Sequence, residues 1–242
     1  MKKSILKVFF ILITGALGGM IFQAFILPYL ATKEYFKQFE FVKILTEREV
    51  NLYPKETVIV RENKALQEAV ERVERSVIGV RAQSKQGVIL EGSGLILTTE
   101  GHVVVLGDLL PKGYDFSFFW EGEELPFEVL GVDKTGSLVK IKVEKTNLPT
   151  LPFADTERIK IGQRVFLVGI VFENGKAKKI VNEGIIKTFD EDFIRTNIFE
   201  KSSLAGSPLF DIEGNVLGLN TIDKEGKVIA ISAKRIQEFT GF

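Results

Sequence analysis

The sequence contains no cysteine and a single histidine, His102. Without cysteine the chain cannot form disulfides, use a thiolate as a nucleophile or build a sulfur-rich metal site. One imidazole and no thiolate are also too few ligands for a typical zinc centre, so we expect neither a metal nor another cofactor. A domain of this size folds without disulfides, and the absence of cysteine therefore leaves the cellular compartment open.

The chain also lacks an excess of charge of either sign. Its 32 basic residues balance its 32 acidic ones. No overall electrostatic field attracts a polyanion, so we expect no nucleic-acid partner. With 242 residues, of which 45% are hydrophobic and 26% charged, the chain has the composition of a globular protein. Its length allows a core domain of roughly 150 to 200 residues and an additional segment.

The additional segment lies at the N-terminus. Residues 8–30 form an apolar run whose only polar side chains are Thr14, Gln23 and Tyr29. As a helix this run is roughly 35 Å long, enough to cross a hydrocarbon core of about 30 Å. A cleaved signal peptide is the alternative, but its apolar core is usually about 7 to 15 residues long. The length favours an uncleaved single-pass anchor, with residues 1–30 as cytoplasmic tip and transmembrane segment.

Lysines flank this run on both sides. Lys2, Lys3 and Lys7 favour a cytoplasmic N-terminus and an extracytoplasmic C-terminal domain in the cell envelope, although three further lysines follow the run and weaken this orientation. Apolar residues at helical spacing then predict a stalk helix and linker over residues 31–62. A short amphipathic helix is predicted over residues 62–76.

From residue 77 onward the pattern changes to short β-rich runs. They recur about every ten residues and are separated by Gly, Asn and Asp, with no long helix between them. This pattern predicts an all-β, antiparallel fold. We predict two packed six-stranded barrels at about residues 76–145 and 159–232, joined by a linker over residues 146–158, within a domain that spans residues 63–242.

Five segments of this domain resemble, in order, motifs of one known family. The segments are VERVERSVIGV, GSGLILTTEGHVVVLGDLL, GVDKTGSLVKIKV, LPFADTERIKIGQRVFLVGIVF and EGIIKTFDEDFIRTNIFEKSSLAGSPLFDIEGNVLGLNT. They resemble the trypsin-like serine proteases, specifically the HtrA-like branch of bacterial envelope proteases. The resemblance covers roughly residues 63–239 and implies the double β-barrel of that family. We expect no appended peptide-binding domain of the kind that many relatives carry.

The resemblance also locates the positions of the family's catalytic triad. The position of its His is Asp108, that of its Asp is Ser137, and that of its Ser is Ala205. A methyl group cannot attack a carbonyl, and loss of the nucleophile alone costs about a millionfold in turnover in enzymes of this mechanism. An ordinary carboxylate is also a poor proton acceptor near neutral pH. The resemblance therefore implies that no catalytic residue remains.

Two serines complicate this interpretation. Ser203 and Ser207 occupy positions where the family has glycine, which puts the oxyanion hole in doubt. Either serine, with Lys201 nearby, offers the residue types of a rebuilt nucleophilic site. His102 lies six residues before Asp108 and is expected at the surface or at the edge of the core.

Three functions follow from these observations. The favoured one is a membrane-anchored pseudoprotease that binds a protein or an extended peptide, because pairing of a peptide with a strand edge does not require the triad. The second is an active envelope serine endopeptidase that uses Ser203 or Ser207. The third is a structural subunit in homo-oligomers or in mixed oligomers with active relatives. The aromatic run over residues 116–120 is an alternative contact surface, although half-buried barrel strands would also contain such rings.

Overall fold

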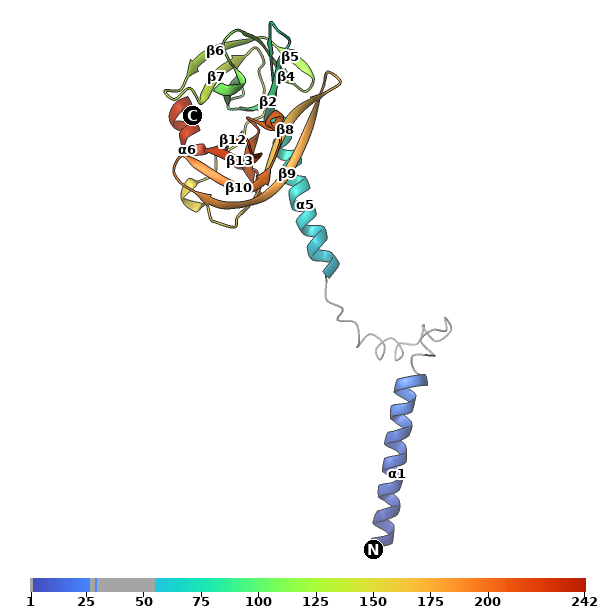
Figure 1. Cartoon of the computed structure of the whole chain (residues 1–242). Helices are drawn as coiled ribbons and strands as arrows, with labels where there is room; N and C mark the ends of the chain where they lie inside the picture. Colours follow the sequence, from blue (N-terminus) through green and yellow to red (C-terminus); the bar gives the residue numbers. More distant parts are fainter. Residues whose placement is uncertain (1, 27–28, 30–54) are drawn as a thin grey trace. The chain divides into compact units, whose positions relative to one another are not determined.

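The computed structural model describes residues 2–26, 29 and 55–242, which separate into an N-terminal unit, Met1–Val58, and a C-terminal unit, Ile59–Phe242 (Figure 1). Most of the predicted stalk, residues 31–54, lies outside the described residues. The predicted division into residues 1–30, 31–62 and 63–242 stays a prediction.

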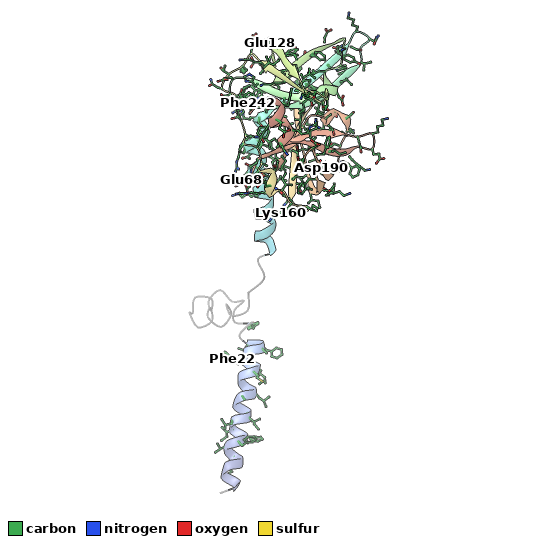
Figure 2. The ribbon with its side chains drawn as sticks, turned by 90° about the vertical axis from the view of Figure 1, so that its left-hand side faces the viewer. Phe22, Glu68, Glu128, Lys160, Asp190 and Phe242 are labelled. Atoms are coloured by element: carbon green, nitrogen blue, oxygen red, sulfur yellow. The ribbon has the colours of Figure 1, made fainter. Side chains whose placement is uncertain are left out.

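The N-terminal unit contains the long apolar helix α1, Lys2–Ile21, which continues as a single π-helical turn, η1, Phe22–Ile26. Its apolar side chains are exposed, and that of Phe22 projects from the helix (Figure 2). By length and composition, Lys7–Ile26 could cross a membrane, and a signal sequence meets the same criteria. Residues 27, 28 and 30 of the predicted span lie outside the described residues.

Helix α5, Lys55–Val73, belongs to the C-terminal unit except for its first four residues, and a 3-10 turn, η3, Glu74–Ser76, follows it. The helix thus begins earlier than the predicted residue 62. Ala69 and Val73 are buried against the core. The Arg72 guanidinium donates a hydrogen bond to the carbonyl of Glu213 (2.6 Å), which fixes this end of the helix on the second barrel.

The first sheet follows α5 and has seven antiparallel strands in the order β5-β4-β1-β2-β3-β7-β6. The strands are β1 Val77–Ser84, β2 Ile89–Ile96, β3 His102–Leu106, β4 Tyr114–Trp120, β5 Glu123–Leu125, β6 Phe127–Val132 and β7 Leu138–Val143. Six strands were predicted. The count differs because Pro126, which has no N–H to donate to a ladder, separates β5 from β6, so the sheet is curled rather than closed.

The second sheet is a closed barrel of six strands in the order β10-β13-β12-β11-β8-β9. The strands are β8 Arg164–Glu173, β9 Lys176–Phe189, β10 Phe193–Phe199, β11 Pro208–Asp211, β12 Val216–Ile222 and β13 Lys227–Ser232. Helix α6, Ala233–Thr240, follows directly, with the Ser232 hydroxyl as its N-cap (Figure 1). In Figure 2, Glu128 marks the first sheet and Asp190 the second.

One hydrophobic cluster spans both sheets, and a second cluster lies within the closed barrel. Phe118 of the first sheet and Phe166 and Phe210 of the barrel are fully buried in the same cluster. The rings of Phe166 and Phe210 lie 5.5 Å apart. The aromatic run of β4 belongs to this packing, and the Trp120 indole N–H donates to the carbonyl of Arg75 (2.8 Å). The predicted all-β fold of two packed barrels is confirmed, with one barrel closed and the other curled.

Candidate functional site

A cavity of about 450 Å³ opens where the two sheets meet. Segments from both sheets line it: the start of β2, the turn after β3, the loop before β11 and the end of β12. The lining residues are Ile89, Leu90, Glu91, Leu106, Asp108, Leu109, Ser202, Ser203, Ala205, Thr221 and Ile222. Two of the three predicted triad positions, Asp108 and Ala205, thus lie in one cavity although 97 residues separate them in the sequence.

Asp108 lies in a 3-10 turn, η4, Gly107–Leu109, directly after β3. Its side chain is exposed. Within residues 55–242 its carboxylate makes no hydrogen bond and no ion pair. The cavity therefore contains a free negative charge at the position predicted for the family's base.

Ser137 lies beside this turn but does not line the cavity. Its carbonyl accepts a hydrogen bond from the Gly107 amide (2.8 Å). The Thr135 hydroxyl oxygen lies 2.6 Å from Asp133 Oδ2 and 2.8 Å from Ser137 Oγ. Because a hydroxyl has one proton, Thr135 donates to the carboxylate and accepts from Ser137. The Ser137 side chain is thereby directed to its own loop rather than to Asp108.

The loop that carries Ala205 is closed on itself. Residues Ser202–Leu204 form a 3-10 turn, η6, and the Ala205 amide donates to the Ser202 carbonyl (3.0 Å). The Leu204 amide donates to the Lys201 carbonyl (2.9 Å) in the same way. An oxyanion hole requires amides that point without a partner at the developing negative charge. In this loop the Ala205 amide already has a partner.

The sequence comparison agrees with this architecture. Residues 85–219 match the family model for the trypsin-like peptidase domain, which is more than half of the chain. The chain belongs to the trypsin-like peptidase domain family. The predicted resemblance to the family's HtrA-like branch is confirmed, because the three similar curated proteins described below are named as probable periplasmic serine endoproteases, DegP-like.

Three such relatives show the extent of the similarity. The Halomonas elongata protein is 32% identical over 140 residues, which is 54% of this chain and 29% of the relative. The Chlamydia pneumoniae protein is 29% identical over 154 residues, 58% of this chain and 30% of the relative. A Pseudomonas putida protein is 29% identical over 155 residues, 61% of this chain and 31% of the relative. The chain thus matches less than a third of the length of these trypsin-like relatives.

The two serines considered for a rebuilt site differ in accessibility. Ser207 is fully buried, and its hydroxyl oxygen accepts a hydrogen bond from the side-chain amide of Asn220 (3.1 Å). Ser203 is half-buried and lines the cavity. Lys201 is exposed, and among the described residues no hydrogen bond joins it to either serine. A Ser-Lys dyad requires such a hydrogen bond and a buried, neutral lysine.

His102 does not line the cavity. It begins β3, opposite Lys142 of β7, and its Nδ1 lies 2.9 Å from the Thr98 hydroxyl oxygen. Its ring packs on that of Phe242 at 5.3 Å between centroids. Burial, together with the charges of Lys140 and Lys142, lowers the pKa of His102 below its usual 6.5. The only imidazole of this trypsin-like chain is therefore a half-buried packing residue, as expected.

The end of β12 has a free edge that the sequence analysis missed. Hydrogen bonds of an antiparallel strand alternate between its two neighbours. The Asn220 amide donates to the Ser207 carbonyl (2.9 Å), and the Asn220 carbonyl accepts from the Gly206 amide (2.7 Å). Ile222, two residues later, faces the same side, where residues 55–242 provide no backbone partner. This edge borders the cavity, and nothing in the local sequence pattern reveals it.

A second feature missed from the sequence is the ion pair that joins α6 to the loop bearing Ser137. Arg235 Nη2 lies 3.4 Å from Asp133 Oδ2, and the two side chains are 18% and 10% exposed. Burial raises the pKa of Asp133, but hydrogen bonds from Thr135 and from backbone amides, with the charge of Arg235, outweigh it, so this pKa lies below its ordinary 3.8.

Replacing Arg235 with alanine should lower the free energy of unfolding by about 2 kcal/mol, because the Asp133 charge then lacks its partner in a mostly buried place. A carboxyl group whose pKa is lower in the folded chain than in the unfolded chain stabilises the fold at pH values above its pKa in the unfolded chain, near 4. This stabilisation is lost as the pH falls through its pKa in the folded chain. The difference between parent and variant should therefore shrink below about pH 4. Urea unfolding at several pH values tests this. Arg195→Ala, which breaks the exposed pair with Asp190, is the control and should cost much less.

Proposed function

We propose that the protein is a membrane-anchored pseudoprotease of the trypsin-like family that binds extended peptide segments of other proteins without cleaving them. One observation carries the proposal: Ala205, whose side chain has no nucleophilic group, lines a cavity that is bordered by a free strand edge. The closed loop, in which the Ala205 amide donates to Ser202, supports it further because that amide is withheld from an oxyanion.

The anchor and the compartment form part of the same proposal. The apolar helix over Lys7–Ile26 is long enough to hold the chain in a membrane, and the relatives are named as periplasmic. With the lysines before the helix in the cytoplasm, the double barrel lies outside it. Assembly with copies of itself or with related subunits stays a prediction from the sequence.

Peptide binding would use main-chain hydrogen bonds. An extended peptide added beside Ile222 continues the barrel sheet beyond the N-terminal end of β11, and the cavity receives alternate side chains. Such binding needs the Ile222 N–H and C=O groups. It requires no bond cleavage and therefore no catalytic group at the triad positions Asp108, Ser137 and Ala205.

Ile222→Pro tests this mode because it removes the N–H of the free edge and leaves the pairing of Thr221 with Ile229 in place. We expect the full-length chain in mild detergent to bind fluorescein-labelled, unfolded casein without cleaving it. Ile222→Pro should weaken that binding at least about tenfold, since it removes one edge hydrogen bond and displaces the next. Fluorescence anisotropy measures binding, and gel electrophoresis measures cleavage.

The control is Val132→Pro, at the end of edge strand β6, away from the cavity. Equal binding by the parent and Ile222→Pro chains, at equal thermal unfolding midpoints, would exclude the β12 edge as the binding site. Casein cleavage that disappears in Ser203→Ala would instead support the endopeptidase alternative.

A further inference from the structure

The cavity beside the β12 edge is lined by charges of one sign. Asp108 and Glu91 are its only charged lining residues, and no lysine or arginine lines it. Glu91 is partly neutralised, because Arg81 Nε lies 3.6 Å from its carboxylate. Asp108 makes no such contact within residues 55–242. The cavity therefore has one carboxylate whose charge is not compensated by a neighbouring group.

The rest of the lining is mostly aliphatic. It includes Leu90, Leu106, Leu109 and Ile222, together with Ile89, which is 42% exposed. A ligand side chain that suits these surroundings has a long apolar stem and a positive end. Lysine and arginine have this form, since their methylene groups cover apolar surface while the charged end reaches a polar partner.

We infer that the peptide bound at the β12 edge carries a lysine or arginine whose stem packs on this aliphatic lining and whose charged end pairs with Asp108. The inference rests on the proposed peptide binding and adds its specificity. The position predicted for the family's base thus becomes a recognition residue, because a charge-assisted hydrogen bond to a carboxylate is stronger than one between neutral groups.

A comparison within the molecule supports the choice of cavity. A second cavity of about 560 Å³, on the second barrel, is lined by Arg158 and Lys160 as well as by Asp155, Asp211 and Glu213. Charges of both signs give that surface no preference for a cation. Among the cavities of the described residues, the one beside β12 combines a free strand edge with an unpaired carboxylate.

The test uses fluorescein-labelled decapeptide mixtures that are random except for one central residue, which is lysine, arginine, norleucine, glutamine or glutamate. Norleucine matches the lysine stem without its charge. Anisotropy with the full-length chain in detergent should show about tenfold tighter binding of the lysine and arginine mixtures than of the norleucine mixture. Asp108→Asn should remove this preference, so that the lysine and arginine mixtures bind no more than about twofold more tightly than the norleucine mixture.

Asp115→Asn is the matched control, because Asp115 is an exposed strand residue outside the cavity. It should keep the full preference. Equal binding of all five mixtures, or a preference that survives Asp108→Asn, would overturn the inference while leaving peptide binding itself intact. Failure of every mixture to bind would overturn the proposed function together with the inference.

Discussion

Replacing Ala205 with serine is expected to leave the protein without measurable peptidase activity. Restoring a hydroxyl supplies the attacking atom but neither of the groups that activate it. Asp108 remains at the position predicted for the base, and the Ala205 amide remains bonded to Ser202. In enzymes of this mechanism, loss of the base alone costs about as much as loss of the whole triad, on the order of a millionfold in turnover.

The combined variant Asp108→His, Ser137→Asp and Ala205→Ser extends this test. If the closed loop is retained, the Ala205 amide still lacks access to the substrate carbonyl. Removal of a single oxyanion-hole donor costs about 10²- to 10³-fold in turnover. We therefore expect the combined variant to stay at least about 10²-fold less active than the Halomonas elongata relative, named as a probable serine endoprotease, assayed in parallel.

Labelling by a fluorophosphonate and release of peptides from casein measure both variants in the full-length, detergent-solubilised chain. Ala177→Ser, on the exposed tip of β9, is the control for a serine introduced outside the cavity. Strong labelling that appears with Ala205→Ser and is absent from the control would show that a working base and oxyanion hole survive. Labelling of the parent chain that is lost in Ser203→Ala would refute the pseudoprotease proposal directly.

Much of the fold could be predicted because it depends on short-range patterns. The strand-length runs separated by Gly, Asn and Asp set the order of the β-strands, and the spacing of Leu66, Val70 and Val73 set the face of α5. Pro126 can be read from the sequence, but it divides a strand in two only if the residues on both sides of it pair with neighbouring strands. The prediction of six strands in the first barrel failed at this residue.

The candidate site was less predictable because its features depend on partners distant in the sequence. The ion pair between Asp133 and Arg235 joins residues 102 positions apart. The free edge at Ile222 exists because β11 begins at Pro208, opposite Leu219, and does not extend alongside Ile222. The bond from the Ala205 amide to Ser202 is local, yet a 3-10 turn of three residues has no periodicity that a sequence could display. The resemblance to the trypsin-like family located the residues of the candidate site, and the structure showed their hydrogen-bond partners.

Replacing Gly107 with alanine is expected to be the most destabilising of the proposed changes, by about 3 kcal/mol or more. An added Cβ would lie 1.9 Å from the carbonyl oxygen of Gly136. The backbone of residue 107 fixes the position of the Cβ, and the Gly136 carbonyl is itself a backbone group, so no side-chain rotation relieves the contact. The Gly107 to Ser137 hydrogen bond must therefore lengthen or break. The turn that carries Asp108 would then move away from the loop that carries Ser137.

Urea unfolding followed by the fluorescence of Trp120, the only tryptophan, measures this change in the first sheet. Gly131→Ala is the matched control, because an added Cβ there meets no atom within 4 Å and its backbone needs no positive φ. Its midpoint should stay close to that of the parent. Equal midpoints for the two variants would mean that the turn carrying Asp108 accommodates the added Cβ with little loss of stability. In that case the close approach of Gly107 to Gly136 would not be what holds Asp108 at the cavity, and the fixed carboxylate required for recognition of a basic side chain would lose its structural basis.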